Sequence, residues 1–459
     1  MRSVFNALNL KYTEETINKI ISFQKELFEI AYSTRTSFVR YSFNDLVGNM
    51  VGNISWRLLL HDFNTLPVLV VPYERKYQLT EEYIRRTNDL MNRDPQTAAN
   101  YLGWKILQHL APFTTPQLRE ESFNLENLYY QVPQQKDLIE QCTLETINYF
   151  RFAVGKMFYD VVADKEERTG VELMMSYVRK AYHKRMNESD WLDEQTRAVV
   201  LRKLKGIIVD YYMPAAFSLR VTWDRRPSYA DIDSYYEAVE QPKYDDKRLL
   251  LVDWVLTMQK FNYDIGLAEL LASIRKKDPA FYSWDRIPTE FGAAYVTAWN
   301  LLVVPVSVLC GPWYQRGRPE AMNFGSLGFV LAHEVAHAFD PTSYQYNYNG
   351  EKKPDDWSQS CREQHVEKRK CFVDQYRGFK FMGHAVDPER TMIENIADGE
   401  GLRLAFEAFR MYRENHPENK NRHLPPPMHQ YSEEQLFFLS FANVSSRGLI
   451  LSHKSSLCF

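Results

Sequence analysis

The chain has 459 residues, of which 45% are hydrophobic and 14% aromatic, enough to build cores for two or three domains. Its 56 lysines and arginines against 59 aspartates and glutamates give a net charge of -3, which excludes an overall basic field for nucleic acid or an anionic membrane. No stretch reaches the roughly 18 apolar residues that a membrane helix needs, and the first residues lack the apolar core of a signal peptide.

Residues 13 to about 210 follow a helical pattern of apolar positions with proline breaks. In the segment SDWLDEQTRAVVLRKLKG, Ser189 or Asp190 can cap the start of a helix and Gly206 can end it. Residues 211–250 mix proline, tyrosine and charge, which indicates a connecting segment, and another helical stretch follows over residues 249–277. The first part of the chain is therefore predicted to be mostly helical.

The segment GAAYVTAWNLLVVPVSVLCGPWY, residues 292–314, predicts two short strands and a turn, because it is rich in valine, tyrosine, tryptophan and threonine. It is the only strong strand signal in the chain. The plainer interpretation is a core hairpin, but a strand beside a metal site could also pair with the backbone of a peptide substrate. The predicted fold class is mainly α (α+β), with a small sheet.

The stretch LAHEVAHAFD, which ends at Asp340, places His333 and His337 four residues apart with Glu334 between them. Its apolar spacing predicts a helix, and residues i and i+4 share one helix face, so both imidazoles can reach a single metal ion. Glu334 is offset from the ligand pair. That position suits a base that takes a proton from a water molecule at the metal, rather than a third ligand.

Two histidines alone make a weak metal site, so a third ligand is needed. The glycine and histidine that follow the second histidine in metzincins are missing after His337. The other common solution is a glutamate on a later helix, and TMIENIADGEGLRLAFEAFRMY offers Glu394 with Asp398 one turn beyond. Asp340 and Asp398 are available to accept the outer N–H of a ligating histidine, although each could equally be an ordinary surface charge.

These segments resemble the neprilysin and endothelin-converting-enzyme family of zinc endopeptidases, which are gluzincins. The resemblance is carried by HEVAHAFD (333–340), ENIADGEGL (394–402), VTAWNLLVVPVSVLCGPWY and EQLFFLSFANV (434–444). Weaker similarity runs back through WLDEQTRAVVLRKL and the region around Cys142, so that most of the chain is covered.

The resemblance implies one zinc ion per chain, held by His333, His337 and Glu394, with Glu334 as general base. It places Asp398, also counted with the catalytic residues, behind His333. It likewise places Asp340 behind His337. The implied substrates are small peptides.

Four apolar residues match family positions that line the pocket for the substrate residue after the scissile bond: Val308, Trp313, Phe329 and Val330. An apolar pocket there implies cleavage on the amino side of hydrophobic residues. The family also implies a thermolysin-like catalytic domain, expected over residues 285–459, and an enclosing helical cap with its connecting region, expected over residues 1–240. An extracellular or plasma-membrane ectodomain location is implied as well, while oligomeric state is left open.

Several features depart from the family pattern. Thr297-Ala298 stands where the family has an Asn-Ala pair on its substrate-aligning strand, and Gly399-Glu400-Gly401 adds a charge to the second motif. After the LFFL motif the family carries a histidine and an arginine that stabilise the transition state, whereas this chain reads Val444-Ser445-Ser446 and offers only His453. The chain is therefore expected to be truncated at both ends.

Glycosylation and disulfide bonds are further expectations. Sequons occur at Asn53, Asn187 and Asn443. Cys142 resembles a family cysteine whose partner would lie upstream, and Cys371 matches one bridged to the extreme C-terminus, where the candidate is Cys458.

Three hypotheses follow from the residues together. The first is a neprilysin-like zinc metallopeptidase. The second is a relative that binds zinc and peptides without catalysis, because the transition-state histidine and arginine are missing. The third is a chain too incomplete to be stable in isolation.

Overall fold

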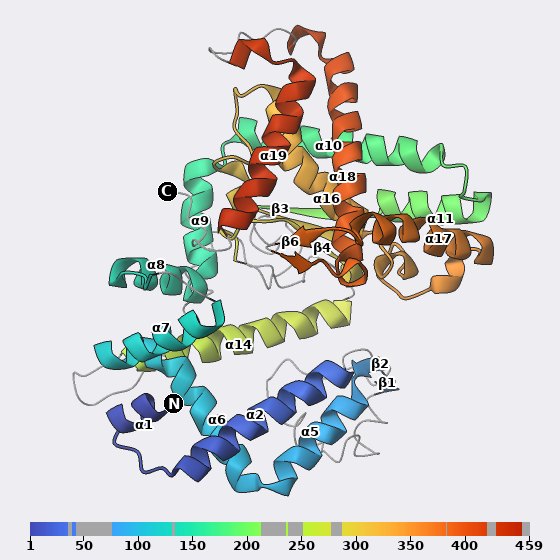
Figure 1. Ribbon diagram of the computed structural model, residues 1–459. Coiled ribbons are helices and arrows are strands. Elements are labelled where there is room, and N and C mark those ends of the chain that lie inside the picture. The colour runs from blue at the N-terminus through green and yellow to red at the C-terminus, as the bar shows by residue number, and fades with distance from the viewer. Residues whose placement is uncertain are drawn as a thin grey trace. The chain divides into compact units, whose positions relative to one another are not determined.

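The computed structural model describes residues 1–34, 39–42, 76–130, 134–212, 236, 251–276, 287–381, 383–419 and 428–451 (Figure 1). The chain divides into two compact units, Met1–Cys142 with Tyr236–Ser283, and Thr143–Tyr235 with Trp284–Phe459. Most described residues are helical, which confirms the mainly α fold class with a small sheet. The functional division into residues 1–240 and 285–459 stays a prediction. Among the described helices, none has the length and apolar character needed to span a bilayer.

The first unit is a set of helices around two small apolar clusters. In one cluster, Trp104 packs edge-on against Phe5, with ring centroids 5.8 Å apart. The helix predicted over residues 249–277 is confirmed as α14. The elements are α1 (Arg2–Ala7), α2 (Glu14–Thr34), β1 (Val39–Ser42), β2 (Lys76–Leu79), α5 (Glu81–Arg93), α6 (Pro95–Leu110), η2 (Ala111–Phe113), α7 (Pro116–Tyr130) and α14 (Leu251–Lys276).

Helix α8 (Leu138–Tyr149) crosses the boundary between the units. The second unit then contains the helices α9 (Arg151–Val162), α10 (Lys165–Asn187), α11 (Glu194–Lys205), α15 (Glu320–Asn323), α16 (Phe329–His337), α17 (Gln359–Tyr376), α18 (Pro388–Asn415) and α19 (Glu433–Leu451). Its strands are β3 (Ile208–Tyr212), β4 (Ala294–Val296), β5 (Leu301–Pro305), β6 (Lys380–Phe381) and β7 (His384–Ala385). Short turns of helix connect several of these elements: η5 (Thr297–Trp299), η6 (Val306–Leu309), η7 (Phe324–Gly328), η8 (Ser343–Gln345), η9 (Pro354–Asp356), η10 (Pro417–Asn419) and η11 (Met428–Gln430).

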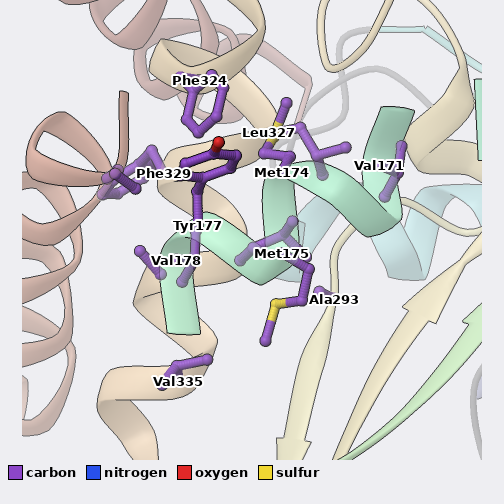
Figure 2. Packing of buried hydrophobic residues seen from close by; sticks show 14 of the residues in the cluster. Val171, Met174, Met175, Tyr177, Val178, Ala293, Phe324, Leu327, Phe329 and Val335 are labelled. Atoms are coloured by element: carbon purple, nitrogen blue, oxygen red, sulfur yellow. The ribbon is translucent and has the colours of Figure 1, made fainter. Parts of the chain in front are cut away.

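The core of the second unit forms where α10 packs against α16 and the turn before it. Figure 2 shows Met174, Met175 and Val178 of α10 among buried residues that include Leu327 and Val335. The hydroxyl of Tyr182 on α10 donates a 2.6 Å hydrogen bond to the carbonyl of Ala332 on α16. The histidine-bearing helix is thus held rigidly by both apolar packing and a buried hydrogen bond.

The sheet of the second unit has the strand order β3-β5-β4. Strand β5 is the central strand, and all five of its residues are buried. Strand β4 pairs with it antiparallel, Tyr295 opposite Leu302, which confirms the hairpin predicted within residues 292–314. The residues after Pro305 form the helical turn η6 rather than more strand.

Strand β3 was not expected from the sequence. It pairs in parallel with β5, Ile208 opposite Leu301, so its partner lies far along the chain and leaves no local signal. Asn300 closes this arrangement in a left-handed conformation with φ 47°. Its side-chain amide donates to the carbonyls of Lys203 and Tyr348, at 3.1 and 3.2 Å.

Helix α11 begins later than predicted. Its cap is Asp193, whose Oδ1 accepts the backbone N–H of Thr196 at 2.8 Å, and neither Ser189 nor Asp190 serves. The preceding residues instead fold back, because the guanidinium of Arg197 donates to the carbonyls of Ser189 and Leu192. Gly206 ends the helix as predicted.

This cap can be tested by comparing two aspartates. Asp193→Ala removes the acceptor for the Thr196 amide, so we expect the midpoint of thermal unfolding to fall by roughly 2–4 °C. Asp190→Ala is the matched control and should change the midpoint by less than about 1 °C. Equal effects of the two substitutions would contradict the assigned cap. Circular dichroism at 222 nm during heating provides the measurement.

Candidate metal centre

Helix α16 has one buried apolar face and one polar face. Leu331, Ala332 and Val335 point into the core and are fully buried. With about 100° of rotation per residue, His333 and His337 lie on the opposite face, separated from each other by about 40°. The helix is preceded by a wider π-helical turn, η7, a form that is often found at functional sites.

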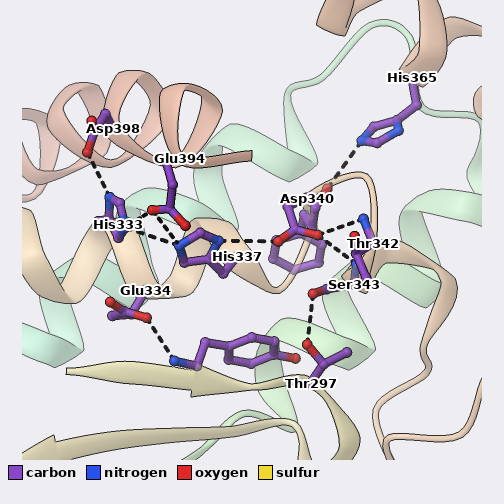
Figure 3. A network of polar contacts seen from close by, with 12 residues as sticks. Thr297, His333, Glu334, His337, Asp340, Thr342, Ser343, His365, Glu394 and Asp398 are labelled. Carbon is purple, nitrogen blue, oxygen red and sulfur yellow. Dashed lines mark hydrogen bonds and ion pairs between the residues drawn. The ribbon is translucent and has the colours of Figure 1, made fainter. Parts of the chain in front are cut away.

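Three side chains converge over this polar face (Figure 3). The Nε2 atoms of His333 and His337 are 3.0 Å apart. The Oε2 atom of Glu394 lies 3.3 Å from the first and 3.6 Å from the second. Zinc bonds of about 2.0–2.1 Å at tetrahedral angles separate ligand atoms by about 3.3 Å. The two imidazoles and the carboxylate therefore fit one zinc ion in both chemistry and spacing.

Helix α18 brings Glu394 to the histidines by approaching α16 very closely at Gly401. A β-carbon placed there would lie 2.8 Å from both the Cα and the backbone nitrogen of His333, closer than real contacts allow. Glu394, Asp398 and Gly401 fall on the same face of α18, seven residues apart from first to last. The glycine is therefore needed for the close contact between the two helices.

Both histidines are held from behind by carboxylates (Figure 3). The Nδ1 of His333 lies 2.9 Å from Oδ1 of Asp398, and the Nδ1 of His337 lies 3.2 Å from Oδ2 of Asp340. A carboxylate only accepts, so each Nδ1 carries a hydrogen and each Nε2 of the neutral ring keeps a lone pair for a metal.

Charge around His337 favours its protonated form when no metal is bound. Burial lowers the pKa of His337, but its hydrogen bond to Asp340 and the nearby carboxylates of Glu334 and Glu394 raise that pKa by more. Burial raises the pKa of Asp340, and the hydrogen bonds from His337 and from two backbone amides outweigh this effect, so the carboxyl stays ionised. Metal binding would displace that proton, because a ligating imidazole must be neutral.

The turn after α16 fixes the position of Asp340. Its Oδ1 accepts the backbone amides of Thr342 and Ser343, at 2.8 and 2.6 Å. The carbonyl of Ser343 in turn accepts the ammonium of Lys203 at 2.6 Å, and this lysine is only 2% exposed. Burial lowers the pKa of Lys203 to about 7, against the opposing effect of Asp340.

Strand β4 positions Glu334. The backbone N–H of Tyr295 donates to Oε2 of Glu334 at 2.8 Å, while the hydroxyl of Tyr295 donates to Oδ1 of Asn300 at 2.7 Å. Among the described strands, β4 is an edge of its sheet, and this N–H points away from β5 toward the carboxylate. One hydrogen bond thus links the predicted strand to the predicted catalytic glutamate.

Thr297 and Ala298, which were expected to bind substrate, follow the end of β4. Thr297 and Ala298 lie in the turn η5 and not on a strand, and Thr297 shares a 2.9 Å hydrogen bond with the Ser343 hydroxyl. That corrects their placement on the substrate-aligning strand, because β4 already ends at Val296.

Two of the four apolar positions, Phe329 and Val330, begin α16. Phe329 lies one turn before His333, with ring centroids 5.9 Å apart, and Val330 is half-buried beside it. Val308 is buried in η6, and Trp313 is half-buried against Phe291, with ring centroids 6.1 Å apart. Their role as a substrate pocket stays a prediction.

The sequence also led us to expect disulfide bonds and glycosylation sites. No disulfide bond joins any two of the four cysteines that the structure describes: Cys142, Cys310, Cys361 and Cys371. Asn187 and Asn443 are exposed. Asn53, His453 and Cys458 lie outside the described residues.

Comparison with known proteins identifies the family. Two sequence profiles described as peptidase family M13 match residues 1–214 and 292–450. The chain belongs to peptidase family M13. The family resemblance seen in the sequence is therefore confirmed.

Relatives in family M13 include Neprilysin-1 of Trittame loki, 28% identical over 381 residues that cover 82% of this chain and 49% of that protein. The endothelin-converting enzyme homolog of Locusta migratoria is 27% identical over 369 residues, covering 79% of this chain and 48% of that protein. The chain spans about half the length of these curated relatives.

Two solved structures share the fold. The zinc metalloprotease ZMP1 of Mycobacterium tuberculosis, in complex with an inhibitor, has a TM-score of 0.67 at 19% identity, covering 94% of this chain and 62% of that one. PEPO from Lactobacillus rhamnosis HN001 has a TM-score of 0.71 at 17% identity, covering 96% and 64%.

The close approach of α18 to α16 leads to a prediction for Gly401. Gly401→Ala forces its methyl group against the backbone of His333, so we expect the free energy of unfolding to fall by about 1–3 kcal/mol. Gly399→Ala on the same helix is the control, because its methyl group would meet only the ring of Phe372, which can turn aside. Chemical denaturation of both variants measures the difference. Equal losses would show that the backbone contact is not limiting.

The buried Lys203 predicts a pH dependence of stability. Its pKa is lower in the folded chain than in the unfolded one, so between about pH 7 and 10.5 the unfolded state binds more protons and stability rises with pH. The slope contributed by this lysine is at most about 1.4 kcal/mol per pH unit. Lys203→Met should remove that slope, whereas the exposed Lys205→Met should keep it. Denaturation midpoints at several pH values measure this, and identical slopes in all three proteins would contradict it.

Proposed function

We propose that this chain forms the zinc-binding part of a neprilysin-like metalloendopeptidase that cleaves small peptides on the amino side of hydrophobic residues. The observation that carries the proposal is the set of three ligand atoms within 3.6 Å of one another, with the Glu334 carboxylate beside them. Membership of peptidase family M13 supports the same reaction class. An extracellular location belongs to the proposal as well.

In this proposal His333, His337 and Glu394 hold a single zinc ion. When bound, the ion supplies Lewis acidity toward the scissile carbonyl and toward a water molecule. Asp398 and Asp340 keep the hydrogen of each imidazole on Nδ1, so that both Nε2 atoms present lone pairs. The protein thus maintains the tautomers that a metal ion requires.

Glu334 then acts as the general base. The amide of Tyr295 donates to its Oε2 and so orients the carboxylate, which takes a proton from the attacking water. The water oxygen bonds to the carbonyl carbon. The carbon–nitrogen bond breaks, and Glu334 returns the proton to the leaving amine. The carboxylate is therefore regenerated in each cycle.

The position of β4 supports binding of an extended peptide. Because β4 is an edge among the strands that the structure describes, a substrate backbone can pair with it beside Glu334. We propose that Val308, Trp313, Phe329 and Val330 accept the side chain after the scissile bond. The Thr297-Ala298 turn would then contact the substrate only at the end of that strand.

A second candidate is a zinc-binding relative without catalysis. It is favoured by the residues after the LFFL motif, where Val444-Ser445-Ser446 replaces the family segment that leads to the transition-state histidine and arginine. Loss of one such oxyanion donor typically lowers turnover by about 10²- to 10³-fold. Such a protein would bind zinc and peptides but release the peptides uncut.

Zinc content and peptide cleavage together test both candidates. Atomic emission should find one zinc per wild-type chain, much less in Glu394→Ala, and one in the control Glu389→Ala, which alters an exposed glutamate earlier on α18. A fluorogenic peptide with a hydrophobic residue after the scissile bond reports activity. Glu334→Gln should keep its zinc and lose about 10²- to 10⁴-fold in rate.

The outcomes separate the candidates. Chelator-sensitive cleavage that is lost in Glu334→Gln supports the peptidase. Zinc without cleavage in the wild-type chain supports the binding protein. A folded wild-type chain that holds no zinc contradicts both candidates.

A further inference from the structure

The second unit contains a cavity of about 160 Å³ that is separate from the metal centre. It lies among α10, α11, α16, α17 and α18 and is partly open to solvent. Neither the three ligand residues nor Glu334 lines it. A cavity of about 150 Å³ lined by apolar side chains can hold a benzene molecule, so this one has room for a single aromatic ring.

Much of the cavity lining is aromatic and aliphatic. Trp191, Trp357 and Phe372 line it, together with Leu192 and Val200, which are both buried. The indole rings of Trp191 and Trp357 are tilted against each other, with centroids 6.0 Å apart. Flat apolar walls of this kind favour a ring that can stack or make edge contacts.

Three cations also line the cavity. Arg185, Lys368 and Arg369 line it, against the single carboxylate of Glu400. Within the described part of the chain, no carboxylate lies in ion-pair distance of any of these three cations. The ammonium of Lys368 instead lies 5.7 Å from the ring centroid of Trp191. The cations are therefore available to an anion that enters from solvent.

His365 adds no charge to this site at neutral pH. Burial lowers the pKa of His365, and Arg369 lowers it further, while a hydrogen bond to the carbonyl of Phe339 opposes both. The Nε2–H of His365 donates that bond at 3.2 Å (Figure 3). The excess positive charge thus comes from the two arginines and the lysine.

We propose that this cavity binds a small organic anion that consists of one aromatic ring on a short chain ending in a carboxylate. The ring lies between the tryptophans and Phe372, and the carboxylate is held by Arg185, Lys368 and Arg369. An uncharged ligand would form no ion pair with the three cations. An anion without a ring would leave the apolar side chains of the cavity in contact with water. The two halves of the site therefore select for the same amphipathic molecule.

Titration calorimetry with 4-phenylbutyrate tests the proposal on the whole chain, with and without a chelator. We expect saturable 1:1 binding in both conditions, because no metal ligand contributes to the cavity. The triple variant Arg185→Gln/Lys368→Gln/Arg369→Gln should weaken binding roughly 5- to 30-fold. The control Lys370→Gln changes a cation on the same helix that pairs with Glu367, and it should leave affinity unchanged.

Two more measurements identify the site. Met186→Trp places a bulky ring at the cavity lining, and it should abolish binding while thermal unfolding shows a folded protein. The neutral amide, 4-phenylbutanamide, should bind several-fold more weakly than the acid. The proposal is overturned if the amide binds as tightly as the acid, if Lys370→Gln weakens binding as much as the triple variant, or if no saturable binding occurs up to about 10 mM. Because the test does not involve zinc, its failure is distinct from failure of the proposed peptidase.

Discussion

The contact of Gly401 with the backbone of His333 is the constraint on which the candidate site depends. Two histidines on one helix can face a metal ion without help, but the third ligand must arrive from a helix that begins 51 residues after α16 ends. Glu394 reaches the histidines because α18 lies against α16 with no side chain between their backbones. The ligand spacing is thus a consequence of helix packing, and a bulkier residue would move the carboxylate away.

A polar network supports the other side of the site. Asp340 accepts hydrogen from His337 and from two amides of its own turn, and that turn is bound to α11 through Lys203. Burying an ammonium group and a carboxylate is costly, and the cost is offset only because each finds good hydrogen-bond partners. Such a network fixes one geometry of His337, which is consistent with preorganisation of a metal ligand.

Much of this arrangement could be predicted because it depends on residues that are close together in the sequence. The spacing of His333 and His337 needs only the pitch of a helix, and the pairing of Glu394 with Asp398 needs the same rule one helix later. The hairpin of β4 and β5 was visible because β-branched and aromatic residues surround its turn. In each case the signal lies within about one or two turns of chain.

Other features could not be predicted because they are created by contacts between distant segments. Strand β3 pairs in parallel with a strand about 90 residues later in the chain. In the sequence, Lys203 matches an exposed charged residue on an amphipathic helix, but in the structure it is buried and donates to the carbonyl of Ser343. The family resemblance placed Thr297 on a strand, whereas β4 ends at Val296 and Thr297 begins the turn η5. The role of Gly401 could not be predicted either. A glycine inside a helix usually lowers helix stability, and its use here becomes clear only from the second helix that packs against it.

The metal centre and the proposed anion cavity use different faces of the same helices. On α18, Glu394 and Asp398 face α16, whereas Ile396 and Glu400 lie about 200° away around the helix axis and line the cavity. Ala336, which also lines the cavity, immediately precedes His337. A ligand in the cavity would press on the supporting side of these helices without touching a metal ligand. Such a ligand would contact α16 through Ala336 and α18 through Ile396 and Glu400, so an effect on the metal centre would pass through the helices that carry its ligands.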